Sequence, residues 1–306
     1  MLEIGPAFSP IAPKAAGWNT FVVDRMSQDE LRAEYSHGGL PVQDIEPVDL
    51  VWRDESLDAA VPQNLHGTFG ACIASHALEH IPDPIGLLLS FDKLLSDRGV
   101  VSLILPDKRF CADFFRPLTN SGAWIEAHDR RASRHSPRTL FEYHAYGVRS
   151  RGRFSWGQER PTDMAPFTTL QDASTTAEAA AKGPYVDAHA WCLTPASFQL
   201  LILELGALRK VPFAVRKVFP TLGCEFFVTL DRSVPDLKHA DLERQRQALM
   251  IATVRELAAQ AKYLDNTAVG DFLGTLRLAM DRATDIPFWR RTVRKVFSSA
   301  RAMKPS

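Results

Sequence analysis

The sequence predicts an α/β fold built on a doubly wound parallel sheet, and two observations carry this prediction. Short apolar runs recur through the first 106 residues, and helix-like segments separate them. The runs are apolar throughout rather than alternating, as expected of strands buried on both faces of a parallel sheet. Alternation of strand and helix implies right-handed crossovers that place helices on the faces of such a sheet.

The predicted elements follow from local signals. The strands of the first third are residues 1–4, 20–24, 48–52, 69–74 and 99–105. A helix begins at Pro84, because Asp83 can cap it and proline suits the first helical turn, and Gly99 follows its end. Later elements are a helix over 195–208 with Thr194 as N-cap, strands over 213–219 and 224–230, and helices from about 236.

Composition and charge exclude several classes of protein. The chain has 306 residues and a formal net charge of zero, so no overall charge excess attracts nucleic acid. Its four cysteines are far apart and form no C-x-x-C pair, which indicates reduced cysteines rather than a disulfide framework or zinc site. No basic leader precedes the first strand, and no apolar run approaches the roughly 18 residues of a membrane span. We therefore expect a cytoplasmic protein.

The turn after the first strand is composed of small residues, as a nucleotide-binding turn requires. Gly5, Ala7 and Ser9 occupy alternate positions of a G-x-G-x-G-like turn. Asp24 ends the second strand, where an acid binds ribose hydroxyls in dinucleotide-binding folds. Only one of the three positions is glycine, so the turn alone also fits an ordinary tight βα connection.

Several segments, taken in order, resemble the class I S-adenosylmethionine-dependent methyltransferases. They are LEIGPAFS at 2–9, VVD at 22–24, RDESL at 53–57, ASHALEHIPDP at 74–84 and LLSDRGVVSLILPD at 94–107. The resemblance implies a Rossmann-like, seven-stranded methyltransferase sheet and S-adenosylmethionine as cofactor. It assigns residues 1–232 to the methyltransferase domain, with a cap insertion at about 118–188, and 233–306 to a C-terminal helical extension.

The same resemblance implies a cofactor-binding set. Its members are Glu3, Gly5, Ala7, Asp24, Asp54 and Ser75, with Asp24 on the ribose and Asp54 on the adenine amine. The chain departs from the family pattern at Pro6, Ala7 and Ser9, which replace the usual glycines. It also begins at the first strand, without the helix that normally precedes it, which leaves open a partner chain or a different start.

Candidates for the chemistry lie where the strands end. Transfer of a methyl group to a hydroxyl needs an aligned nucleophile and a base, and His76, His189 and Asp107 are the catalytic candidates. Each could instead hold a loop, and we interpret Glu79 and His80 in that structural sense. The spacing of His, Cys and acidic residues indicates no metal site. Asp107, Asp113 and His189 could meet in space, but their spacing does not require it.

The acceptor is expected to be polar. Lys108, Arg109 and Arg116 follow the fifth strand, and His144 lies in the insertion; these four are the predicted substrate-binding residues. The PDKR segment is similar to a bacterial subgroup associated with cell-surface polysaccharide synthesis, which suggests a glycan or small-molecule acceptor. The absence of an N-P-P-[YFW] motif argues against a nucleobase. Arginines interleaved with aromatics at 128–160 leave RNA or a nucleotide sugar open.

The last basic segment, 288–304, has an apolar stripe and could contact an anionic membrane surface, meet an acidic partner, or pack on the main domain.

The sequence does not fix the oligomeric state. The leading hypothesis is a methyltransferase that acts on oxygen. The alternatives are a non-catalytic cofactor-binding or scaffold protein, and a dinucleotide-dependent oxidoreductase.

Overall fold

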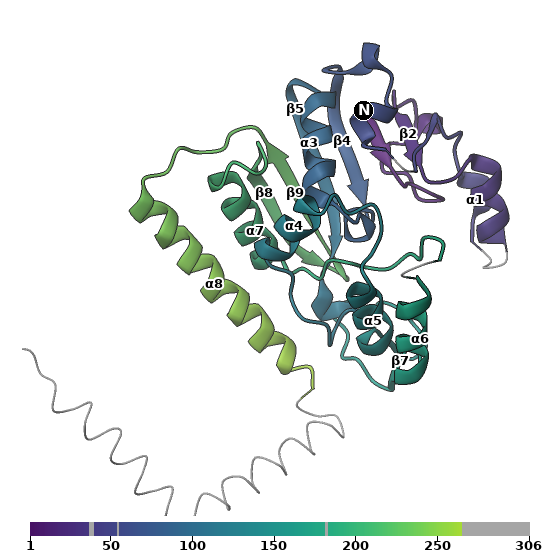
Figure 1. Cartoon of the computed structure of the whole chain (residues 1–306), viewed down its shortest axis with the longest axis vertical. Helices are drawn as coiled ribbons and strands as arrows, with labels where there is room; N and C mark the ends of the chain where they lie inside the picture. Colours follow the sequence, from purple (N-terminus) through teal and green to yellow (C-terminus); the bar gives the residue numbers. More distant parts are fainter. Residues whose placement is uncertain (37–39, 54, 181–182, 265–306) are drawn as a thin grey trace, which may run out of the picture. The chain divides into compact units, whose positions relative to one another are not determined.

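The computed structural model describes residues 1–36, 40–53, 55–180 and 183–264 (Figure 1). The chain divides into two compact units, residues 1–257 and 258–306, and the first contains the sheet. Within the described ranges, no helix combines the length and the apolar character needed to span a membrane. Asp54 and the basic segment 288–304 lie outside the described residues, as does most of the extension expected after 232.

One seven-stranded sheet forms the centre of the first unit, in the order β3-β2-β1-β4-β5-β9-β8. Its strands are β1 (Leu2–Ile4), β2 (Phe21–Asp24), β3 (Leu50–Val51), β4 (Phe69–Ser75), β5 (Leu95–Pro106), β8 (Ala214–Leu222) and β9 (Glu225–Asp231). The first five strands are parallel, whereas β9 runs antiparallel to β5 and β8 antiparallel to β9. The predicted fold class and strand count are confirmed.

The direction of chain progression through the sheet reverses between β1 and β4. Residue Leu2 of β1 lies opposite Phe21 of β2 on one side and Cys72 of β4 on the other. Strands β2 and β3 extend the sheet one way, and β4 and β5 extend it the other way. Ligands of open α/β sheets bind beyond the carboxyl ends of the strands at such a switch point. The segments after Ile4 and Ser75 therefore mark the expected site.

Eight α-helices are described: α1 (Gln28–Tyr35), α2 (Leu57–Ala60), α3 (Pro84–Leu94), α4 (Ser121–Asp129), α5 (Pro137–Tyr146), α6 (Leu170–Ala180), α7 (Pro195–Ala207) and α8 (His239–Ala261). Two predicted caps are confirmed. The Asp83 carboxylate accepts from the Gly86 amide at 2.8 Å at the start of α3. Thr194 and Ser197 form a reciprocal capping box at the start of α7, which satisfies amides that the helix leaves free.

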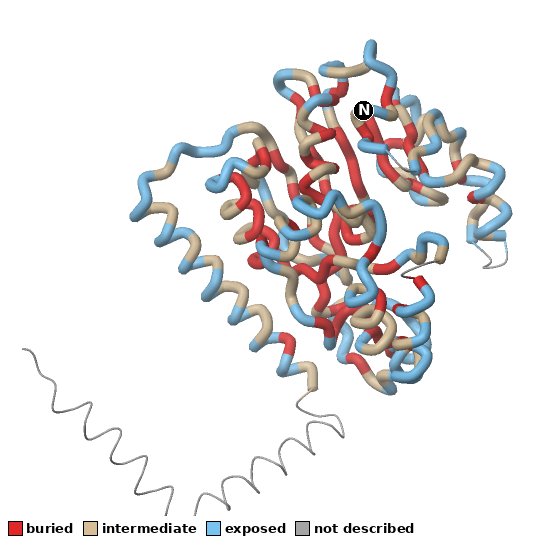
Figure 2. The backbone as a smooth tube through the Cα atoms, in the orientation of Figure 1, coloured by how far each residue is buried: buried red, intermediate tan, exposed pale blue. Residues whose placement is uncertain are grey.

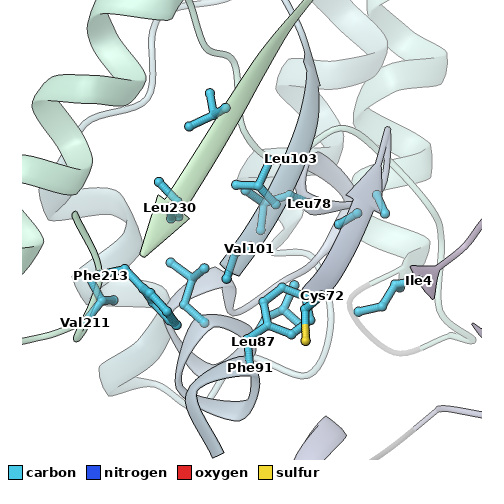
Figure 3. Close-up of a cluster of buried hydrophobic side chains, with 14 of the residues drawn as sticks. Ile4, Cys72, Leu78, Leu87, Phe91, Val101, Leu103, Val211, Phe213 and Leu230 are labelled. Atoms are coloured by element: carbon cyan, nitrogen blue, oxygen red, sulfur yellow. The ribbon is translucent and has the colours of Figure 1, made fainter. Parts of the chain in front are cut away.

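The core is formed where α3 and α7 pack on the sheet. Leu87 and Phe91 of α3 point toward Val101 and Leu103 of β5, with Leu230 of β9 beside them (Figure 3). All five side chains are buried, and buried residues follow the central strands in Figure 2. This apolar layer fixes the position of the strand ends, because interiors packed to crystal density deform little.

Strand β5 begins at Leu95, four residues before the predicted start at 99, and follows α3 without a connecting loop. Within β5, Gly99 allows the backbone to approach the neighbouring strand β4 closely. A Cβ atom at residue 99 would lie 2.8 Å from the Phe69 carbonyl oxygen of the neighbouring strand. The sequence placed Gly99 just after a helix end, whereas its role is to let two strands lie together.

The insertion predicted at 118–188 contains regular secondary structure. It contains α4, α5, α6 and a small antiparallel pair, β6 (Val148–Ser150) with β7 (Met164–Pro166). Helices α5 and α6 share a satellite core that includes Leu140 and Ala177. The two ends of the region meet: the Thr119 amide donates to the Cys192 carbonyl at 3.0 Å, and the Cys192 amide donates to the Thr119 hydroxyl at 2.9 Å.

Helix α8 is attached to α7 by polar contacts. Arg246 pairs with Glu204 at 2.8 Å, and the Glu256 carboxylate accepts from the Ala196 amide at 3.1 Å. The division into units falls inside α8, after Leu257. The boundary predicted at 232/233 stays a prediction.

Candidate active site

The turn after β1 has the left-handed backbone that a small-residue turn requires. Gly5 has φ +60°, and a Cβ atom there would lie 3.7 Å from the Cβ of Ala77 in the segment after β4. Ala7 also has positive φ, at 43°, a conformation that costs an L-residue roughly 1–2 kcal/mol. The chain therefore adopts a glycine-type turn at Ala7 although the glycine is missing.

Glu3 anchors the segment after this turn through its carboxylate. Its side chain is fully buried, and its carboxylate accepts from the Ile11 amide at 2.6 Å and the Ala12 amide at 3.1 Å. Burial raises the pKa of Glu3, and the two backbone hydrogen bonds only partly offset this. An acid at the strand end is thus explained by a turn that loops back over it, and Glu3 positions that turn.

Asp24, at the end of β2, is buried beside the same turn. Its carboxylate accepts from the Arg25 amide at 2.7 Å, and further backbone hydrogen bonds from Met26 and Ala7 reach it. Burial raises the pKa of Asp24 more than these bonds lower it. Ser75 ends β4 on the other side of β1. A small-residue turn, an acid at the next strand end and a serine across the switch point fit a bound nucleoside.

His76 has both ring nitrogens near carboxylates. Nε2 lies 2.6 Å from Oε2 of Glu225, and Nδ1 lies 3.4 Å from Oε1 of Glu79. Burial lowers the pKa of His76, but the two carboxylates raise it to about 10. His76 is therefore an imidazolium at neutral pH. It follows Ser75, the last residue of β4, and its backbone is left-handed, with φ 47°.

The side chains of Asp107, Lys108 and Arg109, which follow β5, make hydrogen bonds with other groups of the protein. The Asp107 carboxylate accepts from Nε of Arg109 at 2.8 Å and from the Thr221 hydroxyl at 2.6 Å, and it is fully buried. Nζ of Lys108, which is also buried, donates to the Phe114 carbonyl at 2.8 Å, and burial lowers its pKa. These contacts give Asp107 and Lys108 roles in holding the segment after β5.

Arg116, just before the insertion, and His144, within it, both have buried side-chain nitrogens. Arg116 is buried, pairs with Asp113 at 2.6 Å, and places its guanidinium carbon 5.6 Å from the Tyr143 ring centre. His144 ends α5, and burial lowers its pKa. Acceptor binding by Lys108, Arg109, Arg116 and His144 stays a prediction.

A cluster of histidines and carboxylates, which the sequence did not reveal as a unit, lies after β4. His80 belongs to the 3-10 turn η5 (Leu78–His80), and His189 comes from the segment before α7. Their ring centres are 4.7 Å apart. Nδ1 of His80 lies 3.0 Å from Asp187 Oδ1, and Nδ1 of His189 lies 2.6 Å from Asp113 Oδ2.

Residues 185–191, which we call the return segment, are fastened to η5. The Ala190 amide donates to the Glu79 carbonyl at 2.7 Å, and Nε1 of Trp191 donates to the Ile81 carbonyl at 2.7 Å. The Tyr185 hydroxyl donates to the His80 carbonyl at 3.3 Å. These bonds explain how two histidines from distant parts of the chain come together.

The carboxylates of the cluster are ionised. Burial raises the pKa of Asp113, but His189 and Arg116 hold it well below the usual range. Burial likewise raises the pKa of Asp187, and His80 lowers it to about 2. The pKa of His189 is raised, because Asp113 outweighs burial. Each carboxylate thus holds a proton on Nδ1 of its histidine and leaves Nε2 for a ligand.

Comparison with known proteins identifies the family. Residues 2–161, slightly more than half of the chain, match the family model described as a methyltransferase domain. The chain belongs to this family. Membership supports S-adenosylmethionine as the cofactor, and the turn at Gly5 with Asp24 fits it.

Similar solved structures include three proteins, each with a TM-score of 0.35. The mitomycin 7-O-methyltransferase MmcR has 12% identity, with 76% of this chain and 48% of MmcR covered, so the match spans about half of that protein. DhpI, solved in complex with SAH, has 14% identity over 75% of this chain and 74% of its own. An S-adenosylmethionine-dependent methyltransferase from Mesorhizobium loti has 14% identity over 75% of this chain and 88% of its own. Comparison with curated proteins gave no match.

Proposed function

We propose that the protein transfers a methyl group from S-adenosylmethionine to a hydroxyl oxygen of a polar acceptor. The observation that carries the proposal is the contact between the two halves of the site. Gly5 of the cofactor turn approaches Ala77, and Ala77 immediately precedes the η5 turn that bears the histidine–carboxylate cluster. A cofactor on the turn and an acceptor at the cluster would therefore lie beside each other at the switch point.

The chemistry requires that the acceptor hydroxyl lose its proton. When bound, the cofactor supplies a methyl group on a sulfonium, and the S–CH3 bond breaks as the O–CH3 bond forms. Of the predicted bases, we favour His189, since Asp113 orients its ring and raises its pKa. The lone pair on Nε2 of His189 can take the proton or hold a group that makes the hydroxyl more acidic. His76, already protonated, is better suited to attract negative charge.

A sugar or polysaccharide acceptor is the more specific part of the proposal. It rests on the PDKR segment at 106–109 and on aromatic rings at the cluster. The Tyr143 ring centre lies 5.7 Å from that of His189. Phe154, in the same insertion, is 51% exposed, and Arg149 lies over its ring at 4.4 Å. Aromatic faces beside charged groups suit a ligand with both apolar and hydroxyl surfaces.

Cofactor binding is tested by the melting shift of the purified protein with S-adenosylhomocysteine, with NAD in parallel. Ligand at 100 times its dissociation constant stabilises the folded state by about 2.7 kcal/mol. We expect a shift with S-adenosylhomocysteine alone, reduced in Asp24→Asn and retained in the control His239→Asn, whose side chain is exposed at the start of α8. A shift with NAD alone would favour an oxidoreductase, and no shift with either ligand would favour a scaffold protein.

Acceptor class is tested with methyl-labelled S-adenosylmethionine and separate panels of nucleotide sugars, oligosaccharides and RNA. We expect label in the sugar panels, at an alkali-stable ether, and loss of labelling in His189→Asn. Label transferred only to RNA would overturn the glycan proposal while leaving the methyltransferase activity intact.

A further inference from the structure

Glu79 is a buried carboxylate with few polar contacts in the described part of the chain. Its side chain is 0% exposed, and neither carboxylate oxygen has a hydrogen-bond partner among the described residues. Nδ1 of His76, 3.4 Å from Oε1, is its ion-pair contact. Burial raises the pKa of Glu79, but His76, His189 and His80 together lower it below the ordinary value. A buried charge of this kind is costly unless it is paired or coordinates a metal ion.

Three potential ligand atoms converge at this carboxylate. One atom each from Glu79, His80 and His189 lie within 4.8 Å of one another. The two imidazole rings are nearly perpendicular, at 85°, so they approach edge to face rather than stacking. Two imidazoles and one carboxylate form a donor set of divalent transition-metal ions, whereas magnesium and calcium prefer oxygen ligands alone.

The outer contacts of both histidines match those of metal ligands. A metal-binding histidine commonly donates its other ring N–H to a carboxylate, which fixes the ring and its tautomer. Asp187 accepts from Nδ1 of His80, and Asp113 accepts from Nδ1 of His189. Because Nδ1 of each ring contacts a carboxylate, Nε2 is the nitrogen that each histidine can offer to a metal ion. Asp113 is itself held by Arg116 at 2.6 Å, so this outer layer is ordered.

We propose that Glu79, His80 and His189 bind a divalent transition-metal ion, with zinc, cobalt and manganese as the candidate ions. This site goes beyond the methyl transfer proposed above and replaces the interpretation of Glu79 and His80 as loop residues. The ligands come from both sides of the insertion, since His189 lies on the return segment and the other two lie on η5.

A role for the ion rests on the proposed function. Three protein ligands leave a coordination position open, and an acceptor hydroxyl that occupies it becomes a stronger acid. Its proton then leaves to solvent as the oxygen attacks the methyl group. His189 would thus activate the acceptor as a metal ligand rather than as a base.

Metal binding is tested on the full-length protein after chelator treatment, by calorimetric titration with ZnCl2 and by the visible spectrum with CoCl2. We expect one ion per chain in the unaltered protein and in the control His239→Asn, and none at this site in Glu79→Gln or His189→Asn. The outer-layer variant Asp113→Asn should bind about 10–100-fold more weakly. Equal binding by all of these variants, or none by the unaltered protein, would overturn the proposal.

A melting measurement separates a ligand role for Glu79 from a structural one. Without metal, Glu79→Gln removes an ion-pair partner of His76, so we expect it to melt lower than the chelated unaltered protein. Added zinc should then raise the melting temperature of the unaltered protein only. If Glu79 serves only as the ion-pair partner of His76, added zinc will leave the melting temperatures of both proteins unchanged. Adding S-adenosylhomocysteine to the same samples keeps the two proposals apart, because cofactor binding without metal binding would refute this site alone.

Discussion

His135 makes the stability of the insertion sensitive to acid. The side chain is 5% exposed, and the residue lies two positions before α5 begins at Pro137. Nε2 lies 3.0 Å from the Tyr185 hydroxyl, and Nδ1 is buried without a hydrogen-bond partner among the described residues. Burial lowers the pKa of His135 to about 4; Asp187 raises it, and the nearby basic residues His80, Arg116 and His189 lower it further.

The size of the effect follows from the difference between the folded and unfolded pKa values. The ordinary histidine value is 6.5, and the folded value is about 4. A folded pKa below the unfolded one means that the unfolded chain binds the extra proton first. The contribution of neutral His135 is therefore complete above pH 6.5 and is lost as the pH falls toward 4. Between pH 7 and 5 this amounts to about 2 kcal/mol of unfolding free energy.

Urea unfolding of the unaltered protein and of His135→Gln at pH 7 and pH 5 measures the contribution of His135 to the unfolding free energy. Glutamine does not titrate and can still contact Tyr185, so the difference between the two proteins isolates the histidine. We expect the unaltered protein to lose about 2 kcal/mol more than the variant. His239→Gln, on the surface of α8, should follow the unaltered protein. Parallel losses in the unaltered protein and His135→Gln would refute the reasoning.

Three further substitutions test the architecture. Thr194→Ala removes the capping box of α7 and should cost about 1 kcal/mol of unfolding free energy, with cofactor binding kept. Leu88→Ala truncates a fully buried side chain of α3 and should cost about 2–5 kcal/mol; a smaller loss would mean a loosely packed core. Ala7→Gly relieves a left-handed alanine and should stabilise the protein by roughly 1 kcal/mol, and a lower melting temperature would show that Ala7 is not strained.

The sheet could be predicted because its signals are local. Uniformly apolar strands, the Asp83 cap and the Thr194 cap each depend on neighbours within a few residues, and the structure has all of them. The start of β5 was misplaced, since Gly99 has two opposite uses: it can follow a helix, or it can permit close strand packing. Only the neighbouring strand decides between these uses.

The positions of the chemically active residues at the strand ends could be predicted from the sequence, but their hydrogen-bond and ion-pair partners could not. His76 and His189 lie at the expected edge, but their partners are far away in sequence. Glu225 is 149 residues from His76, and Asp113 is 76 residues from His189. Asp107 likewise has a partner far away in sequence, since its carboxylate accepts from the Thr221 hydroxyl, and its catalytic role stays a prediction. Titration depends on such tertiary partners, which spacing does not encode.

The hydrogen bonds between Thr119 and Cys192 join the two ends of the insertion. A chain segment whose ends are already joined can change length at little thermodynamic expense, about 0.6 kcal/mol for each doubling. Selection can therefore lengthen, shorten or exchange the segment between these residues while the sheet and its cofactor turn stay as they are. Acceptor preference and fold stability can thus evolve along separate routes, provided that the return segment still delivers His189.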